Sequence, residues 1–394
     1  MMHIALPQLA LCRRVLLMAV AAMMSATAPA ATLNTADGTR VEVTTEVAKL
    51  TAEGLAALKN RAFDVAVSRF TAALARKPDA KAAVMIYDLR CTAYLHRKDA
   101  TRALSDANDA IRLDPQYAAA YALRGVAYRQ QGDFDRAIAE YNNAIRINPR
   151  FAPAYYNRGL AYGHKGQNAR AIKEYDEAIR LNPRYADAYH NRGADYHILG
   201  NFPKAVADYT QAIRYDPQMV NAYSNRASTY EKLGEYGKAQ ADYRRAVRSI
   251  ATDGEQYSNR AWAKTATGDY QGAARDYAKA RQLEPSNEAV LNSVAWFRAT
   301  CPEASLRNGK EAVELAMRSC RASNWKDAAN VDTLAAAHAE AGDFEQAVQY
   351  QTRAIAMEND AKEKRDKEKR LAQYRSGKPW RLEPKLARQA AAQQ

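Results

Sequence analysis

The sequence repeats itself with a period of thirty-four residues, and this period limits the possible fold more than any other feature. A unit of this length cannot bury its apolar side alone, so several units must stack to share a core. The period therefore predicts one continuous solenoid in place of the two or three compact domains that 394 residues would otherwise suggest. The register is marked by a proline, found at Pro115, Pro149, Pro183 and Pro217, and after small shifts at Pro78 and Pro285.

Each row can be numbered so that this proline takes position 32, and other positions then become regular. Position 20 is always alanine and position 8 is always Gly, Ala or Cys, which allows two helices to approach closely. Tyrosine at positions 4, 11 and 24 supplies the bulk between them. Glycine at position 15 of six rows can end a first helix in a left-handed conformation before a second helix begins. The rows start near residues 47, 84, 118, 152, 186, 220, 254, 288 and 328.

Residues 155–162 (YYNRGLAY), followed by Ala171, Tyr175, Ala178 and Pro183, resemble the tetratricopeptide repeat family. The resemblance extends over residues 47–359. It implies an all-α fold, a right-handed α-solenoid of about nine helix-turn-helix units, in which the first helix of each unit lines a concave groove. The eighth row departs from the pattern because about five residues are inserted within residues 301–308. With its neighbours, this row looks like the closing repeats of a subgroup of bacterial tetratricopeptide proteins.

The first thirty residues have the order of a secretory signal peptide. Arg13 and Arg14 precede an apolar run over residues 15–24, and small residues then lead to a cleavage site after Ala30. Ten apolar residues of helix span about 15 Å, too little for a hydrocarbon core of about 30 Å. We therefore expect an exported, periplasmic protein without a membrane span in its mature chain, with outer-membrane association as a further option.

The expected organisation has four parts. Residues 1–30 form the signal peptide, 31–46 an N-terminal extension, 47–359 the solenoid, and 360–394 a charged capping helix with a basic tail, irregular from about residue 377. Cys301 and Cys320 lie at opposite ends of a predicted second helix about 16 Å long, so we expect free thiols in place of a disulfide.

An arginine at position 7 is followed, sixteen residues later, by an acid at position 23. In the first row the two signs are reversed, and in the ninth row neither residue is charged, as direct contact between the paired helices would produce. We expect semi-buried ion pairs that specify helix register more than they add stability, because desolvation offsets much of the attraction. The predicted pairs are Glu53 with Arg69, Arg90 with Asp106, Arg124 with Glu140, Arg158 with Glu174, Arg192 with Asp208, Arg226 with Asp242, and Arg260 with Asp276.

Asparagine recurs at position 6 and has no obvious partner in the sequence. An amide offers both a donor and an acceptor, so a row of amides facing the groove could hold the backbone of an extended peptide. The alternative is that these amides only solvate the groove. We expect the variable groove positions to give specificity, with Trp262 as the main anchor. The candidate groove residues are Asn157, Asn191, Asn225, Asn259, Tyr156, His190, His197 and Trp262.

The sequence contains no glycine-rich phosphate loop, no His-Glu-x-x-His, no Cys-x-x-Cys and no nucleophile elbow, so we expect no catalytic residue and no cofactor. His164, His190 and His197 could approach one another, but they lack a fourth ligand, and we expect no metal site. The net charge of +14 is spread without dense Lys/Arg blocks, which argues against a nucleic-acid partner.

The leading prediction is a non-enzymatic protein-protein interaction scaffold of the bacterial cell envelope that binds an extended peptide in its groove. A second hypothesis is binding of an anionic envelope polymer, peptidoglycan or lipopolysaccharide, through outer arginines and the basic tail. These arginines also have a local explanation, since cations favour the negative end of a helix dipole. A third hypothesis is self-association into a structural assembly. The outer arginines stand at position 29 and are Arg112, Arg146, Arg180, Arg214 and Arg248.

Overall fold

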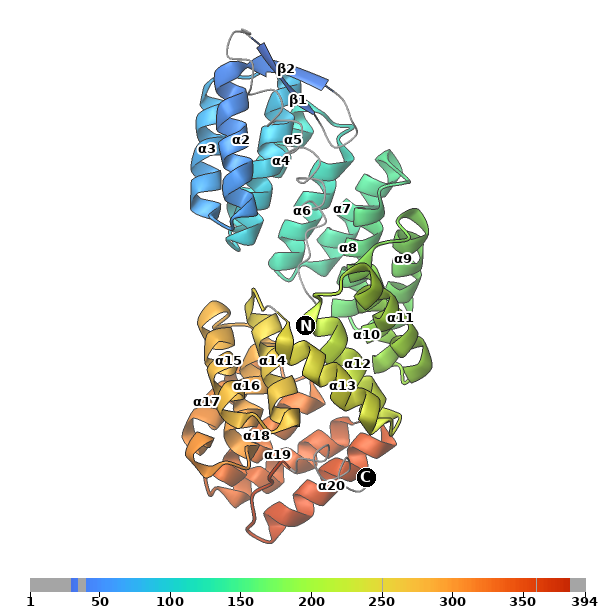
Figure 1. The fold of residues 1–394 in the computed structure, drawn as a ribbon, viewed down its shortest axis with the longest axis vertical. Helices are drawn as coiled ribbons and strands as arrows, with labels where there is room; N and C mark the ends of the chain where they lie inside the picture. The colour runs from blue at the N-terminus through green and yellow to red at the C-terminus, as the bar shows by residue number, and fades with distance from the viewer. Residues whose placement is uncertain (1–29, 35–39, 250, 359, 383–394) are drawn as a thin grey trace. The chain divides into compact units, whose positions relative to one another are not determined.

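The computed structural model describes residues 30–34, 40–249, 251–358 and 360–382 (Figure 1). The predicted signal peptide, apart from Ala30, and the end of the predicted tail lie outside these described residues. The chain divides into two compact units, one up to Leu199 and one from Gly200. We call them the N-terminal unit and the C-terminal unit.

The N-terminal unit begins with a short antiparallel hairpin that the sequence did not indicate. Strand β1 (Ala30–Asn34) pairs with β2 (Arg40–Thr44) so that Ala30 lies opposite Thr44. The helices that follow are α2 (Thr45–Lys59), α3 (Phe63–Ala75), α4 (Ala80–His96), α5 (Ala100–Leu113), α6 (Ala118–Gln130), α7 (Phe134–Ile147), α8 (Ala152–His164), α9 (Asn168–Leu181) and α10 (Ala186–Ile198).

In its described residues, the C-terminal unit contains helices and no strand. It contains α11 (Phe202–Tyr215), α12 (Val220–Lys232), α13 (Tyr236–Arg248), α14 (Gly254–Thr267), α15 (Tyr270–Leu283), α16 (Glu288–Thr300), the 3-10 turn η1 (Ala304–Leu306), α17 (Gly309–Ala322), α18 (Ala328–Glu340), α19 (Phe344–Met357) and α20 (Ala361–Arg375). Across the described chain, α2 to α19 follow one another as helix-turn-helix pairs, which confirms the predicted all-α solenoid fold class.

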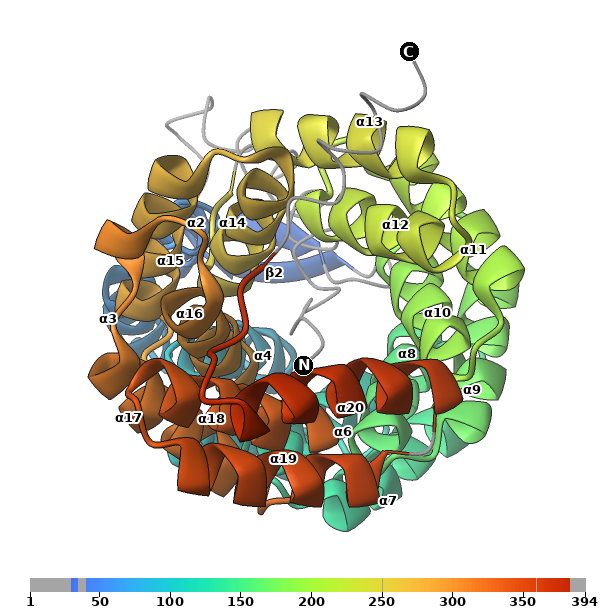
Figure 2. The same ribbon diagram turned by 90° about the horizontal axis from the view of Figure 1, so that it is seen from below.

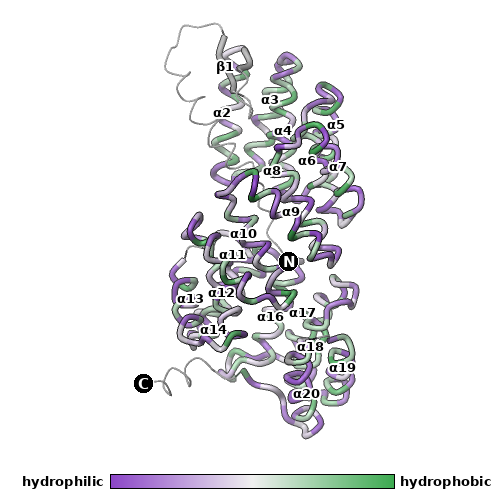
Figure 3. Tube along the Cα trace, turned by 90° about the vertical axis from the view of Figure 1, so that its right-hand side faces the viewer, coloured by the Kyte–Doolittle hydropathy of each residue, from purple (hydrophilic) through white to green (hydrophobic). Residues whose placement is uncertain are grey.

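Local sequence explains where the helices start and stop. The side chain of Asp133 accepts a hydrogen bond from the backbone N–H of Arg136 at 2.9 Å and so caps the start of α7. Gly132, just before it, has a φ of 81°, the left-handed conformation predicted for position 15. Arg61 and Lys98 adopt the same conformation at this position without being glycine. Hydrophobic segments lie within the helices, whereas hydrophilic segments occur both in the helices and at the turns (Figure 3).

The core lies between the two helices of each repeat. The alanines at position 20 are completely buried, from Ala66 to Ala347. Tyr175 on α9 is also fully buried and packs on Gly159 of α8 so closely that a Cβ atom there would lie 2.6 Å from its Cε1. Small residues at positions 8 and 20 therefore make room for the aromatic ring at position 24.

Within each unit, the first helices of neighbouring repeats contact one another. The contacts run from α2 to α4, α6, α8 and α10 in one unit, and from α12 to α14, α16 and α18 in the other. Among the described residues, the second helices of neighbouring repeats make no comparable contacts with one another. Within each unit they lie outside the first helices (Figure 2). The first helices thus form the inner face of each unit.

Helix α20 and the segment after it are fixed to the end of the C-terminal unit. The Arg370 guanidinium on α20 bonds to Asp332 of α18 at 2.9 Å and lies over the ring of Trp296 on α16. Lys232 at the end of α12 pairs with Glu363 at the start of α20. Although residues 378–382 have no regular secondary structure, as expected, the backbone N–H of Leu382 donates to the Thr300 carbonyl at 2.9 Å.

The insertion in the eighth row forms the loop that contains η1. Arg307 in this loop donates to the carbonyl oxygens of Cys301 and Pro302 and pairs with Glu340 of α18 at 3.0 Å. Cys301 caps the end of α16 before the insertion, and Cys320 lies in the last turn of α17. Both are buried free thiols, as is Cys91.

Candidate functional site

The structure brings together the two residues of six predicted ion pairs. Arg90 donates from Nε and Nη2 to the two oxygens of Asp106, at 2.9 and 2.7 Å. This acid is almost fully buried, whereas the sign-reversed pair Glu53 and Arg69 is roughly half exposed. The pairs in contact are Glu53 with Arg69, Arg90 with Asp106, Arg124 with Glu140, Arg158 with Glu174, Arg226 with Asp242, and Arg260 with Asp276.

The seventh predicted pair consists of residues that belong to different units. Arg192 belongs to α10 and Asp208 to α11. Within its own unit, Arg192 donates from Nη1 to Asp176 of α9 at 2.6 Å.

Sequence reasoning missed a second set of partners for these arginines. Arg158 donates from Nη1 to Asn142 at 2.6 Å, and Arg226 donates to Thr210 at 2.9 Å. Both acceptors stand at position 25 of the preceding row, so each arginine joins its own repeat to the one before it. The signal was present in the sequence as a short polar residue recurring at that position, in Thr71, Asn108, Asn142, Asp176 and Thr210.

The asparagines at position 6 have partners inside the chain, so the expectation that they lack one was wrong. Asn157 is 2% exposed and donates to the Pro153 carbonyl at 2.9 Å, one helical turn earlier. Asn191 is 1% exposed and donates to the Tyr156 hydroxyl at 2.7 Å. The reason is that neighbouring first helices contact each other, which places position 6 partly between them.

The two later asparagines are less buried. Asn259 is half-buried and donates to the Asn221 side chain of the preceding repeat at 2.7 Å. Asn225 is also half-buried on α12. These two amides remain closer to the predicted groove-facing role than Asn157 and Asn191 do.

The four variable groove residues divide in the same way. Tyr156 is fully buried and His190 is 5% exposed, so neither presents an exposed side chain at the inner face, and their contact with a peptide stays a prediction. The ring of Tyr156 packs against Tyr185, with ring centroids 4.9 Å apart, and His190 contacts the Asn191 amide oxygen at 3.2 Å. His197 and Trp262 are half-buried, and the Trp262 indole N–H donates to the Tyr243 hydroxyl at 3.3 Å.

The tyrosine at position 24 makes a recurring contact toward the inner face. The Tyr243 hydroxyl donates to the Glu231 carboxylate at 3.0 Å, and the Tyr277 hydroxyl lies beside Thr265. Glu231 and Thr265 both stand at position 12 of their rows. The residue at position 12 therefore determines which polar group lies next to the buried tyrosine hydroxyl of its repeat.

Two histidines stack on phenylalanines of the preceding repeat. His96 lies on Phe63 with ring centroids 4.7 Å apart, and His164 lies on Phe134 at 5.1 Å. Burial lowers the pKa of each imidazole to about 4, helped by Arg61 near His96 and by Arg129 near His164. Both rings are therefore neutral at pH 7.

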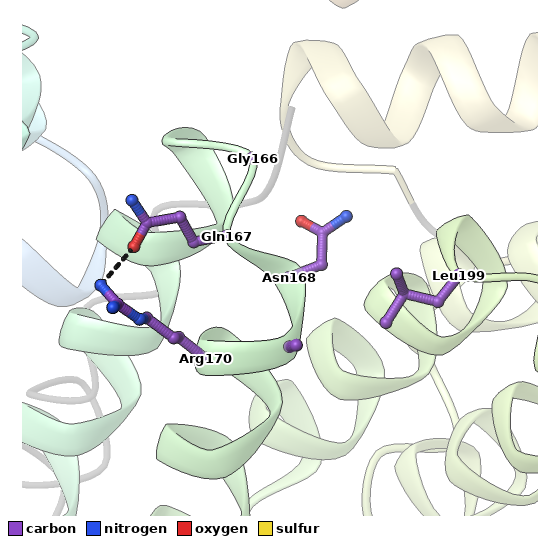
Figure 4. Close-up of a pocket in the computed structure, with 6 residues that line it drawn as sticks. Gly166, Gln167, Asn168, Arg170 and Leu199 are labelled. Atoms are coloured by element: carbon purple, nitrogen blue, oxygen red, sulfur yellow. Dashed lines mark hydrogen bonds between the residues drawn. The ribbon is translucent and has the colours of Figure 1, made fainter. Parts of the chain in front are cut away.

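A shallow pocket of about 450 Å³ lies on the N-terminal unit at the turn between α8 and α9 (Figure 4). It is lined by Gln167, Asn168, Arg170 and the exposed Leu199, and Arg170 donates to the Gln167 side chain at 3.0 Å. The pocket brings together no pair of acid and base that could carry catalysis.

The described residues set two limits on the chemistry. No cluster of three or more His, Cys, Asp or Glu side chains in the described part of the chain could hold a metal ion. In those same segments, no helix has the length and apolar character needed to cross a bilayer.

Models of the tetratricopeptide repeat match residues 51–87, 125–166, 164–197, 193–234 and 220–253. Together with the helix pairs and the buried alanine and tyrosine positions, these matches identify the family. The chain is a tetratricopeptide repeat protein. The matches to this repeat support a protein-protein interaction scaffold.

Solved structures of tetratricopeptide proteins resemble parts of this one. A tetratricopeptide repeat protein from Parabacteroides merdae is 20% identical, with 63% of this chain and 97% of that chain covered and a TM-score of 0.48. PilF from Pseudomonas aeruginosa is 20% identical over 53% of this chain and 95% of its own, with a TM-score of 0.44. A thermophilic tetratricopeptide protein from Thermus thermophilus is 22% identical over 47% and 99%, with a TM-score of 0.42. No curated protein matches the sequence.

Proposed function

We propose that this tetratricopeptide protein is a non-enzymatic scaffold of the bacterial cell envelope that binds an extended segment of a partner protein along its inner face. The observation that carries the proposal is the contact between successive first helices within each unit. This contact aligns equivalent positions of neighbouring repeats at about 10 Å intervals, which matches about three residues of an extended peptide. The signal-like order of residues 1–30 supports the envelope as the compartment.

Trp262 is the anchor that we propose in the C-terminal unit. Its indole N–H is held by Tyr243, while the side chain remains half-buried on α14. A large aromatic side chain that is already fixed in orientation loses little entropy when a partner packs against it. Asn225, Asn259 and His197 are the remaining half-buried candidates for contact with a partner backbone.

The second candidate function, binding of an anionic envelope polymer, rests on the outer arginines. Arg112 and Arg180 are largely exposed, as this function requires. However, Arg112 pairs with Asp109 at 2.8 Å and Arg180 pairs with Glu177 at 2.5 Å, each one helical turn earlier. These acids reduce the positive charge that the stripe presents, so we rank this function second. Self-association is the third candidate function. It predicts that the molar mass of the protein in solution rises with protein concentration.

Site-specific photo-crosslinking separates the first two functions. A benzophenone amino acid replaces Trp262 on the inner face in one variant and the exposed Arg214 in a matched variant. Each is irradiated in envelope extract, and the products are treated with protease or with muramidase. Adducts that form at Trp262 and are removed by protease support the scaffold. Adducts that form only at Arg214, are removed by muramidase and disappear in high salt would replace it with the polymer-binding function.

A further inference from the structure

Two side chains of opposite charge are buried in the N-terminal unit, and each has charged atoms that lack a hydrogen-bond partner among the described residues. The Arg129 guanidinium lies beside the Tyr141 hydroxyl, which leaves two of its nitrogens unsatisfied. Arg129 on α6 is 6% exposed, and none of the described residues accepts a hydrogen bond from its Nε or Nη2. Asp195 on α10 is completely buried, and neither of its carboxylate oxygens receives a hydrogen bond from the described chain. Leaving such groups buried and unpaired costs several kcal/mol each.

Both charges act on the same tyrosine in the repeat between them. Burial raises the pKa of Tyr175 on α9, the Asp195 carboxylate raises it further, and the Arg129 guanidinium opposes the rise. Helices α6 and α10 both contact α8, so the two side chains come from the repeats on either side of the α8–α9 repeat. On α8 in this same repeat, the buried Oδ1 of Asn157 also lacks a donor among the described residues.

Comparison with the other repeats shows that packing does not require an acid at this place. Asp195 stands at position 10 of its row, where five other rows have a fully buried alanine. An alanine would fill the position without the cost of a buried carboxylate. A residue that breaks the pattern at the expense of stability is expected at a functional site. The alanines are Ala93, Ala127, Ala161, Ala263 and Ala337.

The unpaired atoms indicate which chemical groups of a ligand could form hydrogen bonds with them. Nε and Nη2 form one edge of the Arg129 guanidinium, and this edge matches the two oxygens of a carboxylate. The two open oxygens of Asp195 match the edge of a guanidinium or accept from an ammonium group. Asn157 Oδ1 between them can accept from a peptide N–H.

We propose that Arg129 and Asp195 are the two specificity residues of a peptide site on α6, α8 and α10, which takes an acidic side chain at Arg129 and a basic side chain at Asp195. This inference rests on the proposed function and names the chemistry of its ligand. First helices two repeats apart lie about 20 Å from each other. Because both charges act on Tyr175 in the repeat between them, the two charges of the ligand lie within about six residues of each other in an extended chain.

The test uses four pools of synthetic twelve-residue peptides and the full-length chain immobilised on a support. One pool carries a fixed Glu and a fixed Lys four residues apart, two pools carry only one of them, and the fourth carries neither. Retained peptides are counted by mass spectrometry. We expect wild-type protein to retain the Glu/Lys pool at least about tenfold more than the pool with neither charge.

Three variants assign the preference to its residues. Asp195→Ala, which installs the alanine of the other rows, should remove the preference for Lys and raise the thermal midpoint of the protein. Because this variant becomes more stable, lost binding cannot be attributed to unfolding. Arg129→Leu should remove only the preference for Glu. The control is Asp88→Asn, since Asp88 is also buried but already accepts a hydrogen bond from the Tyr117 hydroxyl at 2.7 Å.

The dependence on pH gives a second readout. Burial raises the pKa of Asp195 to about 7, so its carboxylate is largely ionised at pH 8 and largely protonated at pH 6. The preference for Lys should therefore be stronger at pH 8 than at pH 6.

The possible results separate this inference from the function on which it rests. If wild-type protein retains peptides without regard to charge, or if Asp195→Ala keeps the Lys preference or lowers the thermal midpoint, the inference is overturned and the groove function stands. If wild-type protein retains none of the four pools, peptide binding itself fails.

Discussion

Asn191 on α10 donates a hydrogen bond of 2.7 Å to the hydroxyl of Tyr156 on α8, and both side chains are buried. This bond links two neighbouring repeats through their first helices. In the sequence, this asparagine has no obvious partner. In the structure, its hydrogen bond is one of the contacts that hold neighbouring repeats at a fixed spacing. Replacing Asn191 should therefore first lower the stability of the protein, and any effect on peptide binding must be measured after that loss is accounted for.

Asn191→Ala should lower the free energy of unfolding by about 1 to 3 kcal/mol, because it removes a buried hydrogen bond between repeats. Asn259→Ala is the matched control, since this amide occupies the same position but is half-buried, and its loss should cost less than about 1 kcal/mol. Urea denaturation followed by circular dichroism compares the two. Equal losses in both variants would contradict the role assigned to burial.

The ion pairs should contribute unequally according to their exposure. Asp106→Asn leaves the guanidinium of Arg90 partly buried without its charged partner and should cost about 3 kcal/mol. Glu53→Gln affects a pair of about half-exposed side chains and should cost less than about 1 kcal/mol. Thermal unfolding in low and high salt measures both effects. A larger loss for Glu53→Gln would contradict this account.

Gly159→Ala should destabilise the protein by about 1 to 3 kcal/mol because the new methyl group meets the ring of Tyr175. Gly237→Ala is the control, since Gly237 is also helical but has open space around its Cα, and alanine there should stabilise the helix by up to about 1 kcal/mol. Opposite shifts of the thermal midpoint are the expected result. A neutral Gly159→Ala would show that the helix pair can separate without cost.

The two stacked histidines should make the N-terminal unit sensitive to mild acid. The folded pKa of His164, about 4, lies below the unfolded value of about 6.5, so the unfolded state binds more protons between these values. Its contribution to stability is complete above pH 6.5 and is lost as the pH falls toward 4. At pH 5 the loss should reach about 1 to 2 kcal/mol for each such histidine.

His164→Phe tests this dependence because it keeps an aromatic ring against Phe134 and removes the titrating group. The difference in unfolding free energy between pH 7 and pH 5 should shrink by about 1 to 2 kcal/mol in the variant. Adding His96→Phe should double the effect, since His96 has the same lowered pKa and its own stack on Phe63. An unchanged pH profile in the double variant would contradict the assignment.

The repeat period predicted the helix pairs because a 34-residue spacing of small, aromatic and proline residues has one packing solution. The ion-pair partners also followed from the sequence, since Arg90 and Asp106 change together with their counterparts in other rows. The period says nothing of the hairpin that pairs Ala30 with Thr44, because that segment lies before the first row. The left-handed Lys98 was also missed, because the turn geometry there is set by the neighbouring helices and not by glycine.

The inner face was harder to predict than the core. Sequence register shows which positions face inward, but it cannot show that the first helices approach closely enough to bury Tyr156 and His190. Conversely, the buried charges of Arg129 and Asp195 were passed over in the sequence because a single charged residue in a polar helix carries no periodic signal. That these side chains have buried atoms without a hydrogen-bond partner among the described residues is visible only when the neighbouring repeats are in place.

The reversed signs of Glu53 and Arg69 have a consequence for how such an array can change over time. Exchanging the signs of a pair takes two substitutions, and after the first of them two like charges face each other. Where the pair is about half exposed, as here, water screens that repulsion and the intermediate protein can still fold. Arg90 and Asp106 are far more enclosed, so the same exchange would pass through an intermediate with like charges in a dry interface. The order of positive and negative residues in the pair can therefore be exchanged during evolution in the first repeat. In the more enclosed repeats, the unstable intermediate prevents this exchange.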